Sequence, residues 1–268
     1  MSDFLQEMAR HSAERAARAE SIHPDDLDKP VVPLDLGEFD VIAEIKGRSP
    51  AEGKLADADL DRTVQARNYA QGGAAAISVL TEPSRFDGSL EHLREVVAAV
   101  PGVPVMRKDV LVEPIQVLES RKAGASGILL IAAMLSDAHL RVMLDTAYEH
   151  HMFVLLECFD EQDLERVDAL LDYPPDADQA AAGKLLIGVN TRNLRTLEVD
   201  SDRLEKLAPK LPDARCAAES GLHTAEDAAA AARQGYRLAL VGTALMRSDR
   251  PAALIAAMRE AGAAELAA

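Results

Sequence analysis

Five short apolar runs in this chain end in a polar or ionisable residue. Those end residues are Lys46, Lys108, Glu157, Asn190 and Glu219. Lysines and carboxylates gathered at one site would hold one another in their charged forms, because opposite charges nearby favour ionisation. Such a set can donate and accept protons at neutral pH. The residue types therefore indicate acid–base chemistry, provided that the fold brings the five ends together.

The run VIAEIK at 41–46 shows on which face of a strand these side chains must lie. Side chains alternate between the two faces of a strand, so Ile42, Glu44 and Lys46 share one face. That face begins apolar and becomes charged toward the carboxyl end. In a closed barrel, the interior and the surrounding helices bury both faces of each strand, and active sites lie at the carboxyl ends. A barrel therefore explains a buried strand that carries charge at one end.

The apolar runs recur eight times, with stretches of helical spacing between them. The predicted strands are 41–46, 75–81, 103–108, 127–131, 153–158, 185–190, 215–219 and 238–242. Alternating strands and helices predict an α/β fold, a (β/α)8 TIM barrel with an extra N-terminal helical segment. We expect residues 1–268 to form one barrel domain, with 1–37 as N-terminal helical extension and connector. The competing fold, a doubly wound open sheet, would have G-x-G-x-x-G after its first strand, and GRSPAEG does not match.

The composition excludes several classes of partner. The chain has 45 acidic and 29 basic residues and a net charge of −16, so it repels nucleic acid and anionic lipid. No apolar run is long enough to cross a membrane. The N-terminus does not resemble a signal peptide, and the two cysteines fit neither a disulfide framework nor a metal spacing. We therefore expect a soluble cytoplasmic protein, a monomer or weak homo-oligomer, that binds neither nucleic acid nor membrane.

Two loops near the C-terminus have the features of an anion site. ESGLHTAED follows the seventh strand, with Ser220 and Gly221 at a turn and Thr224 as a helix N-cap. VGTALMR follows the eighth strand, and a short helix should begin near Thr243 after Gly242. Backbone N–H groups in the loops after these two strands form the usual phosphate site of a barrel. The placement of the two turns predicts that the ligand carries a phosphate.

Other ionisable residues have simpler interpretations. Metal binding is the competing use of the carboxylates, but no inward histidine accompanies them and lysines repel a cation, so we expect no metal. Cys158 and Cys216 point away from the barrel interior and should be reduced core residues. The acidic run ADADLDR should begin a helix that Asp57 or Asp59 caps.

The motifs together closely resemble the indole-3-glycerol phosphate synthase family. They are IAEIKGRSP, GGAAAISVLTEPSRFDGS, VMRKD, LLEC, IGVNTRNL, ESGLHT and VGTALMR, and they span nearly the whole chain from residue 41. The resemblance implies a carboxy-lyase of tryptophan biosynthesis that uses no cofactor. The implied substrate is 1-(2-carboxyphenylamino)-1-deoxyribulose 5-phosphate. Ring closure with loss of carbon dioxide, followed by dehydration, gives indole-3-glycerol phosphate.

The resemblance also implies which residues catalyse the reaction. Lys108 is the general acid for ring closure, and Glu157 is the acid–base partner used in the dehydration. Glu44 and Lys46 position and polarise the substrate, and Lys46 is also a candidate proton donor. The remaining roles concern binding.

Asn190 and Glu219 hold the sugar hydroxyls and the developing charge, and Arg192 meets an anionic group. The residues implied around the phosphate are Ser49, Ser220, Gly221, Gly242 and Thr243. A phosphate and a carboxylate on the substrate would explain why basic residues gather at one end of an acidic protein.

Three positions depart from the family pattern. The aromatic residue usual after R-K-D is Val110 here, which would loosen the grip on the anthranilate ring. The family's E-V-H appears as Glu157-Cys158-Phe159, and its S-P-S-K-G lid sequence as Ser49-Pro50-Ala51-Glu52-Gly53. Because Gly47 and Gly53 flank a charged segment, we expect 47–56 to close over bound substrate.

Two other functions compete with this interpretation. An isomerase acting on a related phosphorylated aminosugar would need a cysteine–aspartate pair at strand ends, and both cysteines here have the wrong parity. A non-catalytic phosphate-binding barrel should have lost Lys108 or Glu157, and both are present.

Overall fold

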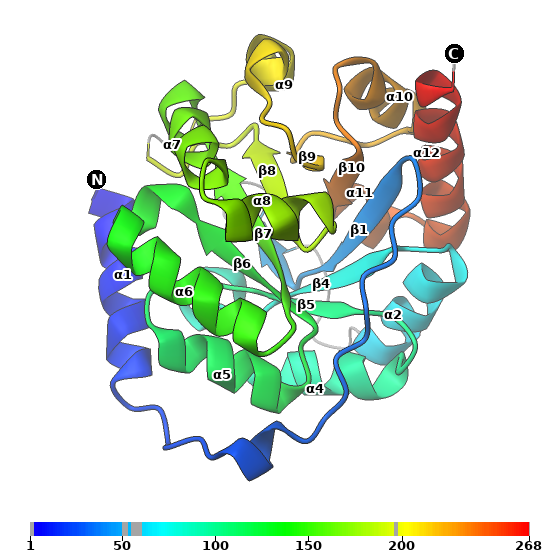
Figure 1. Cartoon of the computed structure of the whole chain (residues 1–268). Coiled ribbons are helices and arrows are strands. Elements are labelled where there is room, and N and C mark those ends of the chain that lie inside the picture. The colour runs from blue at the N-terminus through cyan, green and yellow to red at the C-terminus, as the bar shows by residue number, and fades with distance from the viewer. Residues whose placement is uncertain (1–2, 50–52, 55–60, 196–197, 268) are drawn as a thin grey trace.

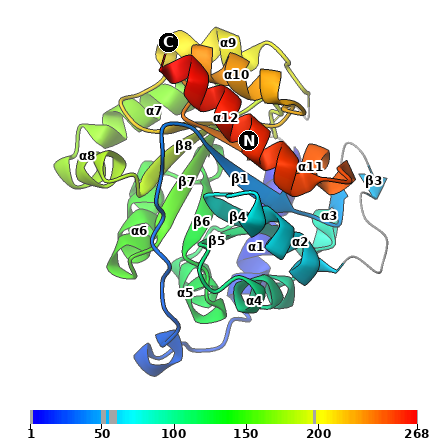
Figure 2. The ribbon, with the colours of Figure 1, turned by 90° about the vertical axis from the view of Figure 1, so that its right-hand side faces the viewer.

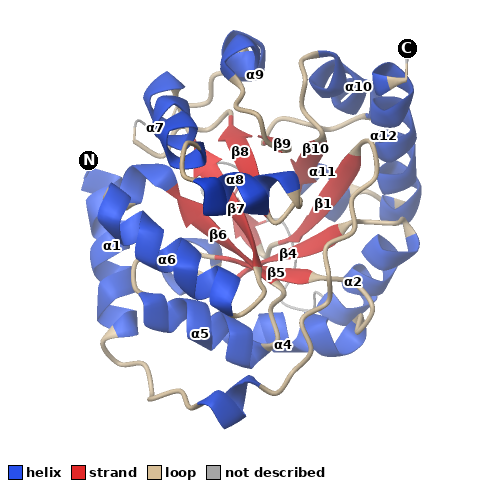
Figure 3. Ribbon diagram, viewed as in Figure 1, coloured by secondary structure: helices blue, strands red, loops and turns tan. Residues whose placement is uncertain are grey.

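The computed structural model describes residues 3–49, 53–54, 61–195 and 198–267. Among them, eight parallel strands close into a barrel in the order β1-β10-β9-β8-β7-β6-β5-β4. Helices surround this barrel on the outside (Figure 1; Figure 3). Strands that follow one another in the sequence lie side by side, and helices connect them. This arrangement is the predicted (β/α)8 TIM barrel, together with an N-terminal helix.

Each barrel strand begins and ends within two residues of its predicted run. The barrel strands are β1 (Asp40–Ile45), β4 (Ala76–Leu80), β5 (Val105–Lys108), β6 (Gly127–Ile131), β7 (Phe153–Cys158), β8 (Leu185–Asn190), β9 (Cys216–Glu219) and β10 (Leu238–Val241). A separate antiparallel pair, β2 (Arg48–Ser49) and β3 (Gly53–Lys54), follows β1.

The described helices fill the intervals between strands, and most begin at a side chain or proline suited to a first turn. They are α1 (Asp3–Ala16), α2 (Arg62–Gln71), α3 (Pro83–Phe86), α4 (Leu90–Ala99), α5 (Pro114–Ala123), α6 (Asp137–Glu149), α7 (Glu161–Leu171), α8 (Pro174–Ala181), α9 (Arg203–Leu207), α10 (Ala225–Arg233), α11 (Thr243–Arg247) and α12 (Pro251–Leu266). Single 3-10 turns are η1 (Pro24–Leu27), η2 (Ala132–Met134) and η3 (Ala208–Lys210). None of the described helices is long and apolar enough to cross a membrane.

Two predicted helix caps had different outcomes. Thr224 caps α10 as expected, and it exchanges hydrogen bonds with Asp227 in a capping box. The cap of α2 was wrong: Asp61 accepts hydrogen bonds from the backbone N–H groups of Thr63 and Val64. Asp57 and Asp59 lie outside the described residues. The helix begins later than predicted because Asp61 is the acidic residue whose oxygen reaches the free N–H groups.

Strand β1 illustrates how the barrel buries both faces of a strand. Val41, Ala43 and Ile45 pack in the outer core, the cluster between the strands and the helices. Ile42 packs in the barrel interior, the cluster that the inward side chains form, where Leu240 is a neighbour. Burying one such side chain contributes about 1.5–3 kcal/mol. The interior cluster fills the barrel below its carboxyl end. The charged residues at that end are therefore next to a layer of packed apolar side chains.

The N-terminal segment contacts both ends of the barrel. Helix α1 lies over the carboxyl end, where Leu5 and Met8 join the interior cluster together with Val110. The connector after α1 runs past η1 and along the amino ends of the strands toward β1 (Figure 1; Figure 2). There Val32 N donates to Ser126 Oγ over 3.0 Å. The extension is therefore packed onto the barrel along its length.

Candidate active site

Lysine 108 lies between two carboxylates at the carboxyl end of the barrel. Its Nζ is 3.1 Å from Glu157 Oε2 and 3.1 Å from Glu219 Oε2. The three side chains come from β5, β7 and β9, so strands that are not neighbours bring them together. Glu157 and Glu219 are 2% and 1% exposed, whereas the Lys108 side chain retains 14% exposure. The ammonium group is therefore held by buried carboxylates and still reaches the mouth, the opening at the carboxyl end of the barrel.

A second ion pair lies at the carboxyl end of β1, between Glu44 in the strand and Lys46 just after it. Lys46 Nζ lies 2.7 Å from Glu44 Oε1, and Glu44 is 3% exposed. At the end of the neighbouring strand β10, a Cβ atom at Gly242, the residue after the strand, would collide with Glu44 Oε1 and lie 2.9 Å from Lys46 Nζ. A glycine is required there because the pair approaches the backbone. All five predicted lysines and glutamates thus gather at this mouth.

The surroundings act differently on each of these groups. Burial alone would lower the pKa of Lys108, but the carboxylates of Glu219, Glu157 and Glu44 outweigh burial and raise it. Burial alone would raise the pKa of Glu44, but Lys46 and Lys108 outweigh it and lower the pKa. Lys108 is therefore held as an ammonium ion, and Glu44 as a carboxylate.

Glutamate 219 corrects the expectation that the whole set is ionised. Burial raises the pKa of Glu219 to about 8, because Lys108 offsets only part of the desolvation and the Glu157 carboxylate opposes a second negative charge. Glu219 Oε1 is buried and has no hydrogen-bond partner among the described residues. A Cβ atom at Gly188 would collide with that same oxygen. Glu219 can thus carry a proton at neutral pH, with one oxygen left for a ligand.

The predicted sugar-binding residues meet at the ends of β8 and β9. Asn190 Oδ1 accepts hydrogen bonds from the backbone N–H of Arg192 over 2.9 Å and from the Ser220 hydroxyl over 2.8 Å. Arg203 Nη1 donates to the backbone oxygens of Asn190 and Thr191 over 3.0 and 2.9 Å. Asn190 is therefore fixed in one orientation, with its NH2 group available to a ligand.

The predicted phosphate loops lie side by side, as β9 and β10 are neighbours. Ser220 and Gly221 both have positive φ, 67° and 79°, and α11 begins at Thr243 directly after Gly242. Successive residues in such turns present backbone N–H groups to an anion. Ser49 lies in β2, where it pairs with Gly53. Residues 50–52 and 55–60 of the expected lid lie outside the described residues.

Serine 78 is a candidate site residue that the sequence interpretation missed. It lies on β4 opposite Glu44 in the register, and its buried hydroxyl has no partner among the described residues. A buried hydroxyl without a partner is costly, so its presence favours contact with a ligand. Its inward parity in AISVL was the available signal, but a serine two places before Leu80 resembles an ordinary small core residue.

Comparison with known proteins supplies the family. The model of the family described as indole-3-glycerol phosphate synthase matches residues 6–258. The chain belongs to the indole-3-glycerol phosphate synthase family. Because enzymes of this family are carboxy-lyases of tryptophan biosynthesis, this chain is one of them.

Individual relatives support the family and the fold separately. The indole-3-glycerol phosphate synthase of Nocardioides is 46% identical over 84% of this chain and 83% of its own length. That of Methanopyrus kandleri is 42% identical over 83% of each chain. A solved structure of 3-hexulose-6-phosphate synthase from Salmonella typhimurium superposes with a TM-score of 0.61 at 15% identity, over 85% of this chain and 99% of that one. That last likeness concerns the fold alone.

The two cysteines do not reach the mouth. Cys158 and Cys216 are free, buried and packed in the outer core. Burial raises the pKa of both thiols, so neither provides the thiolate that an acid–base pair would need. Among the described residues, no group of three or more histidine, cysteine, aspartate or glutamate side chains is placed to hold a metal.

Valine 110 occupies the position where family members usually have an aromatic residue. It is 6% exposed and packs in the interior cluster with Leu5 and Met8 of α1 and with Phe159. Apolar side chains from two other elements therefore already cover this wall of the mouth.

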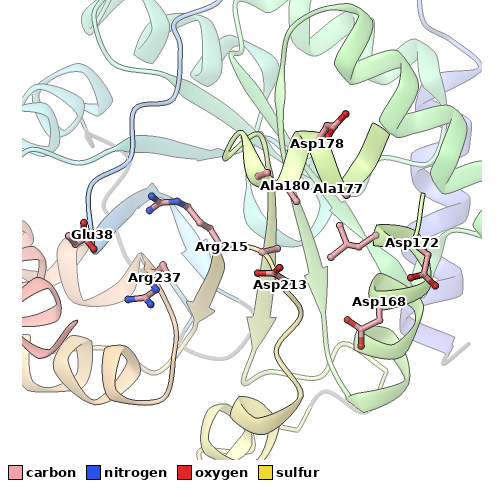
Figure 4. Close-up of a pocket in the computed structure, with 12 residues that line it drawn as sticks. Glu38, Asp168, Asp172, Ala177, Asp178, Ala180, Asp213, Arg215 and Arg237 are labelled. Atoms are coloured by element: carbon pink, nitrogen blue, oxygen red, sulfur yellow. The ribbon is translucent and has the colours of Figure 1, made fainter. Parts of the chain in front are cut away.

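A groove of about 930 Å3 lies at the opposite, amino end of the barrel (Figure 4). Arg215 and Arg237 line it just before β9 and β10, and Asp168 and Asp172 line it from the end of α7. Arg215 Nη1 donates to Gly37 O over 2.6 Å. None of the described salt bridges joins two of these lining side chains. The groove shares no residue with the mouth.

Proposed function

We propose that the charged residues at the carboxyl end of the barrel close the pyrrole ring of 1-(2-carboxyphenylamino)-1-deoxyribulose 5-phosphate. The observation that carries this proposal is the Lys108 ammonium group, held by two buried carboxylates from β7 and β9. A raised pKa keeps the proton on Lys108 until a developing alkoxide takes it. Residues 1–268 act as one barrel domain, with 1–37 as its extension.

The first step forms the carbon–carbon bond. The anthranilate ring carbon that bears the carboxylate attacks the ketone carbon, and Lys108 gives its proton to the ketone oxygen as it becomes a hydroxyl group. Carbon dioxide then leaves, and the electron pair of its bond restores the aromatic ring. Glu44 and Lys46 polarise the substrate beside this centre, where they form an ion pair of 2.7 Å.

The second step removes water. Glu157 takes a proton from the carbon next to nitrogen, and the hydroxyl group leaves with a proton from Lys46. The new double bond completes the indole. We give Glu157 this role because it faces the mouth beside Lys108, 3.1 Å away, so that one substrate can meet both side chains.

Binding of the substrate uses the neighbouring loops. The phosphate lies against Ser220, Gly221, Gly242 and Thr243, and Ser49 is the fifth residue that we assign to it. Arg192 meets the carboxylate, and Asn190 and Glu219 hold the sugar hydroxyls. We place this reaction in the cytoplasm, in a monomer or weak homo-oligomer, with no cofactor and no metal. Two unpaired buried cysteines support a reducing compartment.

The direct test is conversion of this substrate by the purified protein, followed by indole fluorescence and by release of one carbon dioxide per product. Lys108→Met should lose about 10²–10⁴ in kcat, the usual contribution of a general acid. Its melting temperature should hold or rise, because removing a crowded functional charge often relieves strain. The matched control is Lys206→Met, whose side chain is 60% exposed and pairs with Asp200 at the surface. A folded Lys108→Met protein with near-normal kcat would show that Lys108 is not the general acid.

A further inference from the structure

The end of strand β5 that carries Lys108 is held by the sheet on one side only. Pairing with β4 continues to Lys108, and Thr81 N donates to Lys108 O over 3.0 Å. Pairing with β6 is confined to Met106 and Arg107. The backbone that follows Lys108 therefore leaves the hydrogen-bond ladder at the point where the side chain must be aimed. Other contacts have to fix it.

Aspartate 109 supplies those contacts. It is 4% exposed and points away from the mouth, because it alternates with Lys108. Its Oδ2 accepts from Thr81 Oγ1 over 2.7 Å and from Arg107 Nη2 over 2.8 Å. Its Oδ1 accepts from the backbone N–H of Val110 over 2.7 Å. The carboxylate thus ties its own backbone to Thr81, the residue that follows β4.

Helix α1 completes this network from outside the barrel. Arg15 Nη2 lies 2.7 Å from Asp109 Oδ1. One turn earlier, the Ser12 hydroxyl donates to the backbone oxygen of Val110, and Gln116 Nε2 donates to Ser12 Oγ over 2.9 Å. The two residues that follow Lys108 are therefore both anchored to α1. Buried charge pairs of this kind add little net stability, so a positional role explains them better.

We propose that Arg15 and Asp109 are positioning residues for Lys108, and that α1 is in this way part of the catalytic apparatus. The inference rests on the proposed role of Lys108 as the general acid. Arg15 contacts neither the mouth carboxylates nor the loops that hold the phosphate. Its contacts are Asp109, Val110 O and, at 3.6 Å, Glu82 Oε1, so it acts on Lys108 through the backbone at 109–110. A displacement of about 1 Å in a reacting group can cost 10²-fold in rate.

The test compares two substitutions that each detach α1 from the barrel at one point. Arg15→Met removes the contact with Asp109 and the longer ion pair with Glu82. Glu7→Gln removes an ion pair that α1 makes without Arg15, a 3.0 Å contact with Arg85 in which both side chains are more than one-third exposed, 38% for Glu7 and 45% for Arg85. We expect Arg15→Met to lower kcat about 10- to 10²-fold with KM changed less than about threefold. Glu7→Gln should leave kcat within about twofold, and Arg15→Lys should recover part of the loss.

The same substitution in the Lys108→Met background separates positioning from general destabilisation. If Arg15 acts through Lys108, Arg15→Met should cause no further loss of the residual rate there. Should Arg15→Met fail to fold, Asp109→Asn carries the same test, because asparagine keeps one acceptor oxygen but cannot pair with both arginines. It should lower kcat in the wild-type background and leave it unchanged without Lys108.

The outcomes distinguish the inference from the proposed function. If Lys108→Met is impaired but Arg15→Met behaves like Glu7→Gln, the positioning role is wrong and the proposed function stands. An equal loss from Arg15→Met with and without Lys108 would also overturn it. If Lys108→Met retains its kcat, the proposed function fails at its general acid, and the inference fails with it.

Discussion

The carboxyl and amino ends of this barrel both carry charged side chains, but they hold them in different ways. At the carboxyl end, Lys108 is flanked by two glutamates that are nearly inaccessible to water. In the groove at the amino end, Asp168 and Asp172 stand exposed on a helix terminus, and no described salt bridge joins them to Arg215 or Arg237. The first group is desolvated and paired, and the second is solvated and separate.

This difference indicates where the fold tolerates the unfavourable free energy of removing charged side chains from water. Desolvating an ionised side chain costs several kcal/mol, and pairing with another charge repays that cost incompletely. Exposed charges require no such compensation. A cluster of ionisable groups that remains buried at the end of the barrel where active sites lie is therefore better explained by chemistry than by stability. The groove at the amino end has no such feature.

Among the substitutions that test this contrast, the largest expected effect comes from filling the space between β8 and Glu219. Gly188→Ala places a Cβ atom onto Glu219 Oε1 and should displace that carboxylate from Lys108. We expect kcat to fall about 10²-fold, the scale of a 1 Å misplacement. The matched control is Gly102→Ala at the amino end, where the added Cβ meets no described atom within 4 Å. Equal kcat values for the two variants would mean that the Lys108–Glu219 contact is not needed.

The next effect concerns the dependence of stability on pH. The pKa of Glu219 is about 8 in the folded chain, against an ordinary value of 4.5. Between these two values the unfolded chain has released a proton that the folded chain keeps, so this group lowers stability as pH rises through that window. Glu219→Gln removes the effect. The melting temperature of the variant minus that of the wild type should therefore increase from pH 5 to pH 8.

Glu226→Gln is the control for this titration, because the Glu226 side chain is 76% exposed. Its melting-temperature difference should stay constant over the same range. A constant difference for Glu219→Gln as well would show that Glu219 titrates like an exposed glutamate, and that burial does not govern the mouth.

A smaller effect tests the wall formed by Val110. Because Leu5 and Met8 already pack on this side chain, Val110→Phe should overfill the cluster and lower the free energy of unfolding by about 1–3 kcal/mol. KM should not improve. A several-fold tighter KM, on the scale of roughly 1 kcal/mol for an aromatic contact, would instead mean that the wall is open to the substrate ring.

The smallest effects belong to the groove. Asp168→Asn and Arg237→Met alter charges that no described salt bridge joins to each other or to the mouth. Each should change the free energy of unfolding by no more than about 0.5 kcal/mol, and kcat should stay within about twofold. A large loss of kcat from either variant would show that the two ends of the barrel are functionally coupled. The proposed difference between them would then be wrong.

Local patterns predicted the parts of the molecule that depend on local physics. Period-two alternation located the eight strands and predicted which end residues face inward, and Thr224 was recognisable as a cap from its place before a helix. The same reasoning failed at Asp61, because several aspartates in one run can begin a helix and only packing selects among them.

Properties that depend on burial by distant segments were not predictable. Opposite charges suggested that Glu219 is ionised, but its pKa is set by desolvation and by the glutamate of β7. The orphaned hydroxyl of Ser78 has the same origin, since only the closed barrel removes its water. The contact of Arg15 with Asp109 joins residues 94 positions apart and leaves no pattern in either segment.

A crystal structure of the protein with indole-3-glycerol phosphate bound would test the central claim most directly, because it shows which end of the barrel holds the product. The account predicts the phosphate within about 3 Å of backbone N–H groups in the loops after β9 and β10, with the indole ring beside Lys108 and Glu157. Product bound in the groove near Arg215 and Arg237, or in the mouth but beyond reach of Lys108, would contradict it.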